Sequence, residues 1–441
     1  MTALEQLTGL IESWTGICMT RGGADGSLRR FAGARVKELG LSSIDAYVKQ
    51  LAGPPCAERE LLVNAVTVNY TWFYRDGEQL EAVGRLLRDA WPTGTALNLW
   101  VPGCATGEDA YALAMLAERV GRPVSVLGTD INSTSLAWAR EGRYGTWSMR
   151  DLPDALKPGF TAAGKGALQV GDDVKRAVRF EPHNLVEPPK RPMGAGWDLV
   201  LCRNVLIYFS REGTQAAHER LGASLSPGGW LVLGANESVW QEPPGLKQAR
   251  LAGRPALYRP LASGRLPAGL EPDFRETPAA ASPPTVVGPG SEPVAASRPV
   301  AARRAPTAVA LVAEGAALMS SSLADAISPL MRARELDPLS VEAHLHLGIA
   351  FHLSGDALSA APSLRSALLL EPTLWPAAFY LALTYENLGQ PAEAQREYRR
   401  VVDQSHRPLV LEVRGVLGDL ESWKIDVLAL ARRRSKGASP S

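Results

Sequence analysis

Apolar runs of strand length recur between residues 95 and 260, and helix-length segments separate them. The runs are LNLWV at 97–101, SVLGTD at 125–130, AVRFEPHNL at 177–185, DLVLCRNVLIYF at 198–209 and GGWLVLGANES at 228–238. Parallel strands joined by helices give this alternation, so the pattern predicts a doubly wound α/β sheet. It is less regular between residues 142 and 180, which leaves room for a small subdomain.

Residues 1–75 carry helical patterns and few strand signals. In SLRRFAGARVKELG the apolar residues share one face of a helix, and Arg29, Arg30 and Lys37 lie away from that face. Arg35 falls on the apolar face, where an unpaired guanidinium would be costly. Either its head group extends to solvent, or it opens onto a cleft or meets a carboxylate.

Residues 261–306 are rich in Pro, Ala, Ser and Arg and lack apolar periodicity, which predicts a flexible linker. Beyond it the segment starting at Val341 aligns with the segment starting at Trp375 at an offset of 34 residues. A third copy starts near Thr307, and an amphipathic stretch after the repeats suits a capping helix. The spacing resembles the tetratricopeptide repeat, so residues 307–436 are expected to form three repeats plus a cap. Pro329 and Pro362 fall inside second helices, where kinks or shortening are expected.

The turn in NLWVPGCATGEDAY separates the first strand from a helix. It has small residues that allow a ligand to approach the backbone, but not the Lys-Ser/Thr of a phosphate-binding loop. Glu108 opens the helix, either as a favourable charge at the helix end or as part of a pocket wall. Asp130 ends the second strand, where an acid can bind ribose hydroxyls. A nucleoside ligand without phosphate fits this combination, and S-adenosylmethionine is the obvious candidate.

Composition narrows the function classes. The net charge is +1, so nothing global indicates nucleic-acid binding, and the four cysteines form no CxxC pair, which argues against a metal site or a disulfide scaffold. The sequence shows neither a signal-peptide pattern nor an apolar run long enough to span a membrane. A cytoplasmic protein is expected.

Six motifs in fixed order resemble the CheR-type chemotaxis receptor methyltransferases, over about residues 5–260. They are NYTWFYR at 69–75, WVPGCATGEDAY at 100–111, GTDIN at 128–132, HNLVE at 183–187, CRNVLIYF at 202–209 and LSPGGWLVLGANES at 225–238. The resemblance implies a helical substrate-recognition domain at 1–75 and a Rossmann-like methyltransferase domain with a small β-subdomain at 76–260. It also implies methyl transfer from S-adenosylmethionine to glutamate side chains of methyl-accepting chemotaxis proteins, leaving S-adenosylhomocysteine.

The same resemblance assigns residues to the site. Arg75 and Tyr208 would lie nearest the methyl group and the incoming carboxylate. The residues around the cofactor would be Asn69, Thr71, Arg75, Glu108, Asp130, Asn184, Leu185, Asn204 and Val205. Arg29, Arg30, Arg35 and Lys37 would bind the acidic receptor helices.

Two other readings remain. One is a catalytically silent scaffold that responds to S-adenosylmethionine and acts mainly through its repeats. The other is a methyltransferase for small molecules or nucleic acid, which the near-zero net charge disfavours. The partner of the repeats, recognition of a receptor tail peptide and recruitment to membrane receptor arrays stay open at this stage.

Overall fold

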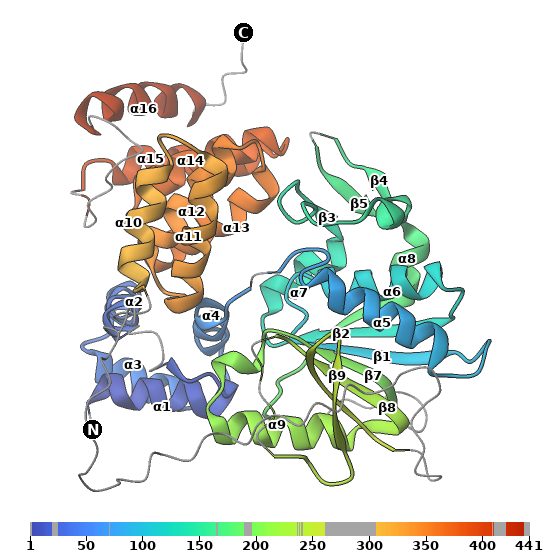
Figure 1. The fold of residues 1–441 in the computed structure, drawn as a ribbon. Helices are drawn as coiled ribbons and strands as arrows, with labels where there is room; N and C mark the ends of the chain where they lie inside the picture. The colour runs from blue at the N-terminus through green and yellow to red at the C-terminus, as the bar shows by residue number, and fades with distance from the viewer. Residues whose placement is uncertain are drawn as a thin grey trace, which may run out of the picture.

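The computed structural model describes residues 2–19, 25–69, 71–164, 166–188, 196–235, 237, 239, 241–260, 306–407, 409 and 420–435. Nearly all of the predicted linker at 261–306 lies outside these ranges. Figure 1 shows a helical N-terminal part, a sheet covered by helices and a second helical part. No helix within the described ranges is both long and apolar enough to cross a membrane.

In the described residues of the N-terminal part, four helices are formed: α1 (Ala3–Thr15), α2 (Asp25–Glu38), α3 (Ile44–Leu51) and α4 (Ala57–Val66). Side chains fix the start of two of them, because Thr2 and Glu5 form a capping box on α1 and Ser43 caps α3. Leu28 and Phe31 of α2 are buried, as the apolar face predicted.

The central sheet has seven strands in the order β6-β2-β1-β7-β8-β10-β9. The strands are β1 (Leu97–Pro102), β2 (Val124–Asp130), β6 (Val178–Pro182), β7 (Trp197–Cys202), β8 (Leu225–Leu233), β9 (Lys247–Leu251) and β10 (Arg254–Tyr258). The first five in this order pair in parallel, which confirms the α/β prediction. The hairpin of β9 and β10, which the apolar pattern did not predict, adds two antiparallel strands at one edge.

Helices cover both faces of this sheet. They are α5 (Gly77–Asp89), α6 (Glu108–Arg119), α7 (Ser133–Glu141), α8 (Asp172–Ala177) and α9 (Arg211–Ala223). Figure 1 shows α5 and α6 on one face and α9 on the other. This arrangement leaves the carboxyl ends of the parallel strands facing the N-terminal helices.

The irregular stretch after residue 142 forms a small antiparallel sheet in the order β3-β5-β4. Its elements are β3 (Arg143–Tyr144), a 3-10 helix η2 (Asp154–Gly159), β4 (Phe160–Ala162) and β5 (Leu168–Val170). Phe73 packs edge-on against Tyr144 and Phe160, with ring centroids 4.8 and 5.1 Å apart. The predicted small subdomain is therefore present and anchored by the motif that precedes α5.

The C-terminal part consists of helix pairs. They are α10 (Ala308–Leu318) with α11 (Leu323–Leu336), α12 (Val341–Leu353) with α13 (Ala357–Leu370), and α14 (Trp375–Asn387) with α15 (Pro391–Gln404), followed by α16 (Leu420–Ser435). Gly355 and Gly389, 34 residues apart, end the first helix of successive pairs with φ of 79° and 73°. A Cβ on Gly348 would lie 2.6 Å from Leu364, so a small residue is required where the two helices cross. These features confirm the tetratricopeptide prediction.

Pro329 and Pro362 do not shorten their helices. Both α11 and α13 run for 14 residues, the same length as α15. Burial explains why each helix tolerates its proline, because the neighbours Leu330 and Ala361 are held in the core and packing offsets the lost hydrogen bond. The expectation of shortened helices was wrong.

The N-terminal helices and the repeats share one continuous hydrophobic core. It joins Leu28 and Val66 of the N-terminal part with Leu330 and Val341 of the repeats. Because this packing crosses between the parts, it does not mark where one domain ends and the next begins. The predicted domain limits at residues 75, 260 and 306 therefore stay a proposal.

Candidate functional site

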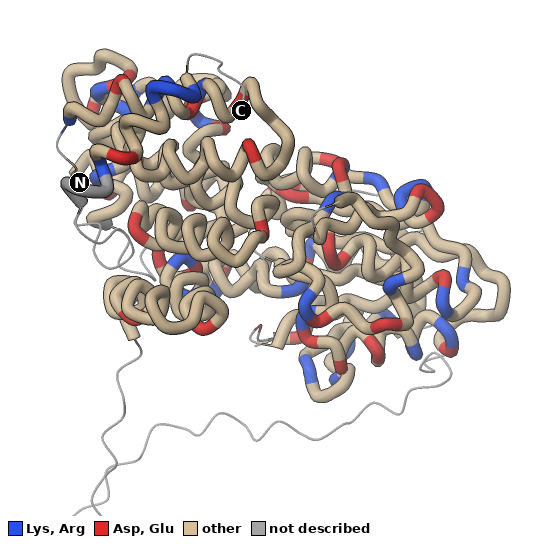
Figure 2. Tube along the Cα trace, turned by 90° about the horizontal axis from the view of Figure 1, so that it is seen from above, with Lys and Arg blue, Asp and Glu red and all other residues tan. Residues whose placement is uncertain are grey.

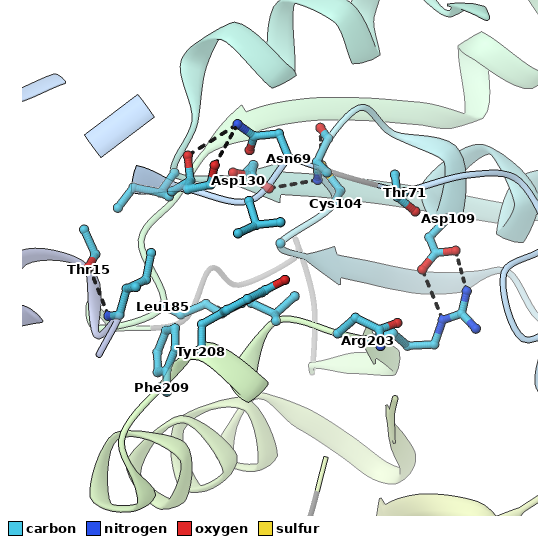
Figure 3. Close-up of a pocket in the computed structure, with 18 of the residues that line it drawn as sticks. Thr15, Asn69, Thr71, Cys104, Asp109, Asp130, Leu185, Arg203, Tyr208 and Phe209 are labelled. Atoms are coloured by element: carbon cyan, nitrogen blue, oxygen red, sulfur yellow. Dashed lines mark hydrogen bonds and ion pairs between the residues drawn. The ribbon is translucent and has the colours of Figure 1, made fainter. Parts of the chain in front are cut away.

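A cavity of about 820 Å³ lies at the carboxyl ends of β1, β2, β6 and β7. It lies where open α/β sheets bind ligands. We call it the main cavity. Nine residues from the sequence assignment line it, namely Asn69, Thr71, Arg75, Asp130, Asn184, Leu185, Asn204, Val205 and Tyr208. Figure 3 shows Asn69 and Asp130 on one side and Tyr208 on the other.

The turn after β1 forms the floor of the main cavity. Gly103 has φ of 68°, and a Cβ there would lie 2.4 Å from Cγ2 of Val205, so no larger residue fits. The Asp130 carboxylate holds this turn, because it accepts the Ala105 N–H at 2.8 Å and the Asn132 N–H at 2.8 Å. Each oxygen keeps a further lone pair for a ligand hydroxyl. The turn and the acid thus form one unit.

Glu108 is placed differently from the other predicted residues. It is 1% exposed, and it does not line the main cavity. Its carboxylate accepts hydrogen bonds from the hydroxyls of Thr106 at 2.6 Å and Ser148 at 3.0 Å. It lines a neighbouring cleft of about 1590 Å³, the wide cleft, which shares Asn69 and Thr71 with the main cavity. Glu108 therefore supports the wall between two hollows.

Burial raises the pKa of Glu108 to about 7, and the two hydroxyl hydrogen bonds only partly oppose the rise. A carboxyl whose pKa is higher in the folded state binds protons more tightly there, so its contribution to stability is lost as pH rises from about 4.5 to about 7. We expect Glu108→Gln to gain stability relative to the wild type between pH 6 and pH 8, by about 1 kcal/mol. Thermal unfolding of both proteins at the two pH values measures this.

The quantity to compare is the difference in stability between Glu108→Gln and the wild type, because the effect of buried histidines on stability is the same in both proteins and cancels. Burial lowers the pKa of His218 to about 4 and of His344 to about 3, so these groups destabilise the fold at low pH in both proteins. A difference that stays constant, or that shrinks as pH rises, would contradict the placement of Glu108.

The loop after β7 forms the opposite wall. Arg203 donates two hydrogen bonds to Asp109, from Nη2 at 2.6 Å and from Nε at 3.1 Å, and its side chain is 1% exposed (Figure 3). Arg203 also donates to the carbonyl of Arg75 at 2.7 Å. This ion pair therefore connects β7, α6 and the motif that carries Arg75.

Glu237 fixes the rest of that loop. Its carboxylate is 3% exposed and accepts the N–H groups of Val205 at 2.9 Å, Leu206 at 2.8 Å and Gly234 at 2.5 Å. Asn204, the residue before Val205, adopts a left-handed backbone conformation with φ of 59°. Sequence reasoning missed Asp109, Arg203 and Glu237 as supports of the site, although all three lie within the quoted motifs.

Asn184 ties the main cavity to the N-terminal helices. Its amide nitrogen donates to the carbonyl of Trp14 at the end of α1, and its amide oxygen accepts the Val186 N–H at 3.2 Å. Thr15 and Ile17, which follow Trp14, also line the main cavity. The N-terminal part therefore completes the cavity.

The four basic residues predicted on α2 separate into two groups. Arg29 and Lys37 are exposed, and Arg30 is half-buried. Arg35 is buried and binds Glu58 through Nε at 2.8 Å and Nη2 at 2.7 Å, with a further contact to Glu38 at 2.5 Å. The expectation that Arg35 contacts a receptor helix is corrected, because its guanidinium is used inside the helical part. This is the carboxylate alternative that the sequence left open.

Numbered along the chain, the strands of the central sheet follow the order 3-2-1-4-5-7-6. That order, with a cavity at the strand ends and an acid closing the second strand, defines a Rossmann-like α/β fold suited to a nucleoside cofactor such as S-adenosylmethionine. The donor set fits the cofactor, because the tight glycine floor and Asp130 suit a nucleoside and the cavity wall offers carboxylate and amide oxygens.

Comparisons with known proteins narrow the class to a family. Residues 69–252 match the family described as CheR methyltransferase, SAM binding domain. The chain is 35% identical over 191 residues to chemotaxis protein methyltransferase 1 of Vibrio cholerae, covering 41% of this chain and 69% of that protein. It is 33% identical over 215 residues to a chemotaxis protein methyltransferase of Vibrio parahaemolyticus, covering 46% and 78%. The chain belongs to the CheR family of chemotaxis protein methyltransferases.

Two solved structures are similar to portions of the chain. Magnesium protoporphyrin IX methyltransferase from Synechocystis is 17% identical with a TM-score of 0.26, covering 52% of this chain and 97% of that one. A tetratricopeptide domain from Aspergillus fumigatus is 19% identical with a TM-score of 0.24, covering 31% and 87%. Family membership rests on the sequence matches, which make the chain a protein methyltransferase with S-adenosylmethionine as cofactor.

Proposed function

We propose that the protein methylates glutamate side chains of methyl-accepting chemotaxis receptors and forms glutamate methyl esters. The observation that carries this proposal is the position of Tyr208. It lines the main cavity and also a second cavity of about 830 Å³, the side cavity, whose wall includes Cys18, Met19 and Val66 of the N-terminal part. Tyr208 therefore lies where an acceptor that binds the N-terminal helices would meet the donor.

The chemistry requires few specialised groups. A glutamate with a pKa of about 4.3 is ionised near neutral pH, so its oxygen attacks without a general base. When bound, S-adenosylmethionine supplies an activated methyl group on a sulfonium. The protein aligns the acceptor and excludes water around two opposite charges.

Arg75 and Tyr208 are proposed to orient the carboxylates. The Arg75 guanidinium lies 4.7 Å from the centroid of the Trp72 ring, which restricts where it points. Burial raises the pKa of Tyr208, and nearby Arg75 only partly opposes this, so the hydroxyl stays protonated and can donate a hydrogen bond to a carboxylate.

The remaining assignments are proposed as the family resemblance implied them, with two changes of role. The cofactor contacts are Asn69, Thr71, Arg75, Asp130, Asn184, Leu185, Asn204 and Val205. Glu108 supports the wall from behind, and its position in the wide cleft makes it an indirect contributor. Arg29, Arg30 and Lys37 are proposed to attract acidic receptor helices, and Arg35 to hold α2 in shape.

The distribution of charged residues supports recognition of the receptor by a small group of basic residues rather than by a whole face of the protein. Figure 2 shows basic and acidic positions interspersed along the trace, so no single-charge face dominates this view. The receptor would therefore be recognised by the local group on α2. We also propose that the repeats bind a partner protein and that the enzyme works in the cytoplasm at receptor arrays, because the receptor's methylated helices lie there.

Incubation with labelled S-adenosylmethionine and a receptor cytoplasmic fragment tests the proposal. The expected product is a base-labile methyl ester on glutamate. Tyr208→Phe should lower kcat by about 10- to 100-fold and leave the Kd for S-adenosylmethionine unchanged, because only the bond to the acceptor carboxylate is lost. Tyr258→Phe is the matched control, since Tyr258 is buried in β10 against Trp230, outside the main cavity.

Base-stable label, or no label on any receptor fragment while the cofactor still binds, would refute glutamate transfer. Equal kcat in Tyr208→Phe and Tyr258→Phe would refute the role of the hydroxyl.

A further inference from the structure

The junction between the first two repeats lies on the N-terminal helix that carries the basic residues. The Ser27 hydroxyl on α2 donates to Oδ2 of Asp337 at 2.5 Å. Nη1 of Arg30 lies 3.4 Å from both carboxylate oxygens of Glu342 at the start of α12. Figure 1 shows α2 below the lower end of α10, and α13 also contacts α2. One of the basic residues proposed to attract the receptor is therefore already paired within the chain.

The same junction closes the side cavity. Glu335, Leu336 and Pro338 line it together with Tyr208 and Val68. The Glu335 carboxylate and Tyr208 thus border one hollow, and the negative charge of Glu335 is one of the causes that raise the pKa of Tyr208. A carboxylate of this chain therefore lines the same cavity as Tyr208, the residue proposed to meet the acceptor glutamate.

Further contacts join the repeats to α7 and to the stretch that follows β3. Asp356 accepts the Trp147 N–H at 2.8 Å while it caps α13 through the Ser359 N–H at 3.0 Å. Trp147 packs edge-on against Phe351 with centroids 5.7 Å apart. Arg365 lies over the ring of Trp138 at 5.1 Å. The repeats therefore form part of the wall of the wide cleft, which adjoins the main cavity.

Comparison with the second repeat separates the contacts that every repeat makes from the contact that docks the first repeat on α2. Glu371 lies 34 residues after Asp337, and each carboxylate accepts the N–H two residues on, from Thr373 and Leu339, at 3.1 Å. Only Asp337 makes the additional bond to Ser27. The local turn needs an acid in both repeats, and the first repeat also uses its acid to dock on α2.

We propose that Glu335, Asp337 and Glu342, the acidic edge, are an internal competitor for the acidic receptor helix on α2 and at Tyr208. The proposal rests on the proposed function, because it assumes that α2 receives the receptor. Closed molecules bind the cofactor but exclude the receptor, and methyl transfer requires the acidic edge to leave α2. A partner that binds the repeats in the open arrangement would activate the enzyme.

A reversible covalent lock tests this in the full chain. Ser27→Cys with Asp337→Cys places two thiols where a hydrogen bond of 2.5 Å joins the native side chains, and a Cys56→Ser background removes an exposed thiol. Oxidation should slow methyl transfer to a receptor fragment by about tenfold or more, and reductant should restore it. Affinity for S-adenosylmethionine, measured by calorimetry, should not change. The single Asp337→Cys variant controls for loss of the local turn contact.

A second pair of variants opens the contact instead. Glu342→Lys should lower KM for the receptor fragment by about two- to fivefold at constant kcat, because a partly exposed ion pair of the closed state is lost. Glu371→Lys is the matched control on the next repeat and should leave KM unchanged.

The outcomes separate the two proposals. A locked enzyme that methylates the fragment at full rate, a disulfide that does not form in the folded chain, or an unchanged KM in Glu342→Lys would overturn the internal competitor. Absence of transfer in wild-type and reduced enzymes alike would instead overturn the proposed function. Whether or not methyl transfer is detected, the yield of the disulfide reports how often residues 27 and 337 are in contact.

Discussion

Asparagine in place of Asp130 is expected to weaken binding of S-adenosylmethionine by about 100-fold. Asp130 holds the turn under the main cavity through the Ala105 N–H, accepts the Asn132 N–H as well, and lines the main cavity. An amide keeps only one acceptor oxygen, and its NH2 group would oppose one of the two N–H donors. Calorimetric titration with S-adenosylmethionine measures the loss, and circular dichroism checks that the fold persists.

Asp198→Asn is the matched control for this variant. Asp198 also bridges two elements of the sheet, accepting the Asn98 N–H at 2.8 Å and the Ser226 hydroxyl at 2.9 Å, but it lies outside the main cavity. It should change stability and leave cofactor affinity intact. Equal affinity losses in both variants would show that Asp130 acts only through general stability.

Methionine in place of Arg203 is expected to destabilise the fold by about 3–5 kcal/mol and to abolish methyl transfer. The guanidinium pairs with Asp109 in the wall of the main cavity and holds the carbonyl of Arg75. Its removal leaves the Asp109 carboxylate, which is only 13% exposed, without a counter-charge. Thermal unfolding and the labelled transfer assay together record both losses.

The double variant Arg203→Met with Asp109→Leu separates charge from packing. It should recover much of the stability, because no buried charge is left unpaired, but not the activity. Arg119→Met removes a half-exposed pair with Glu81 at 2.7 Å and should cost less than about 1 kcal/mol. A double variant as unstable as Arg203→Met alone would refute the electrostatic explanation.

Periodicity was sufficient to predict the elements, because each strand and helix buries a face that the local pattern defines. The five parallel strands and the 34-residue repeats follow from such patterns. The β9–β10 hairpin does not, since edge strands bury less surface and their pattern is weaker. The position of the main cavity could be predicted because open α/β sheets bind ligands at the carboxyl ends of their strands, and the sequence shows where each strand ends.

Side-chain partners could not be predicted in the same way. The pattern placed Arg35 on an apolar face and required a carboxylate or a cleft, but it could not identify Glu58, 23 residues away. The sequence allowed Glu108 to be either a favourable charge at the helix end or part of a pocket wall. Its actual position, buried beside the wide cleft, depends on a hydrogen bond from Ser148 in a distant turn. The bond between Ser27 and Asp337 joins positions 310 residues apart, and only tertiary packing brings them together.

The contact between α2 and the first repeat has a consequence for where the enzyme would be active. Because both partners belong to one chain and share one hydrophobic core, the acidic edge meets α2 at a high effective concentration. A dispersed receptor helix at low concentration would rarely displace it, whereas a lattice of closely packed receptors presents many acidic helices at a comparable local density. The enzyme would then respond to receptor crowding, staying inactive in dilute solution and becoming active within a cluster.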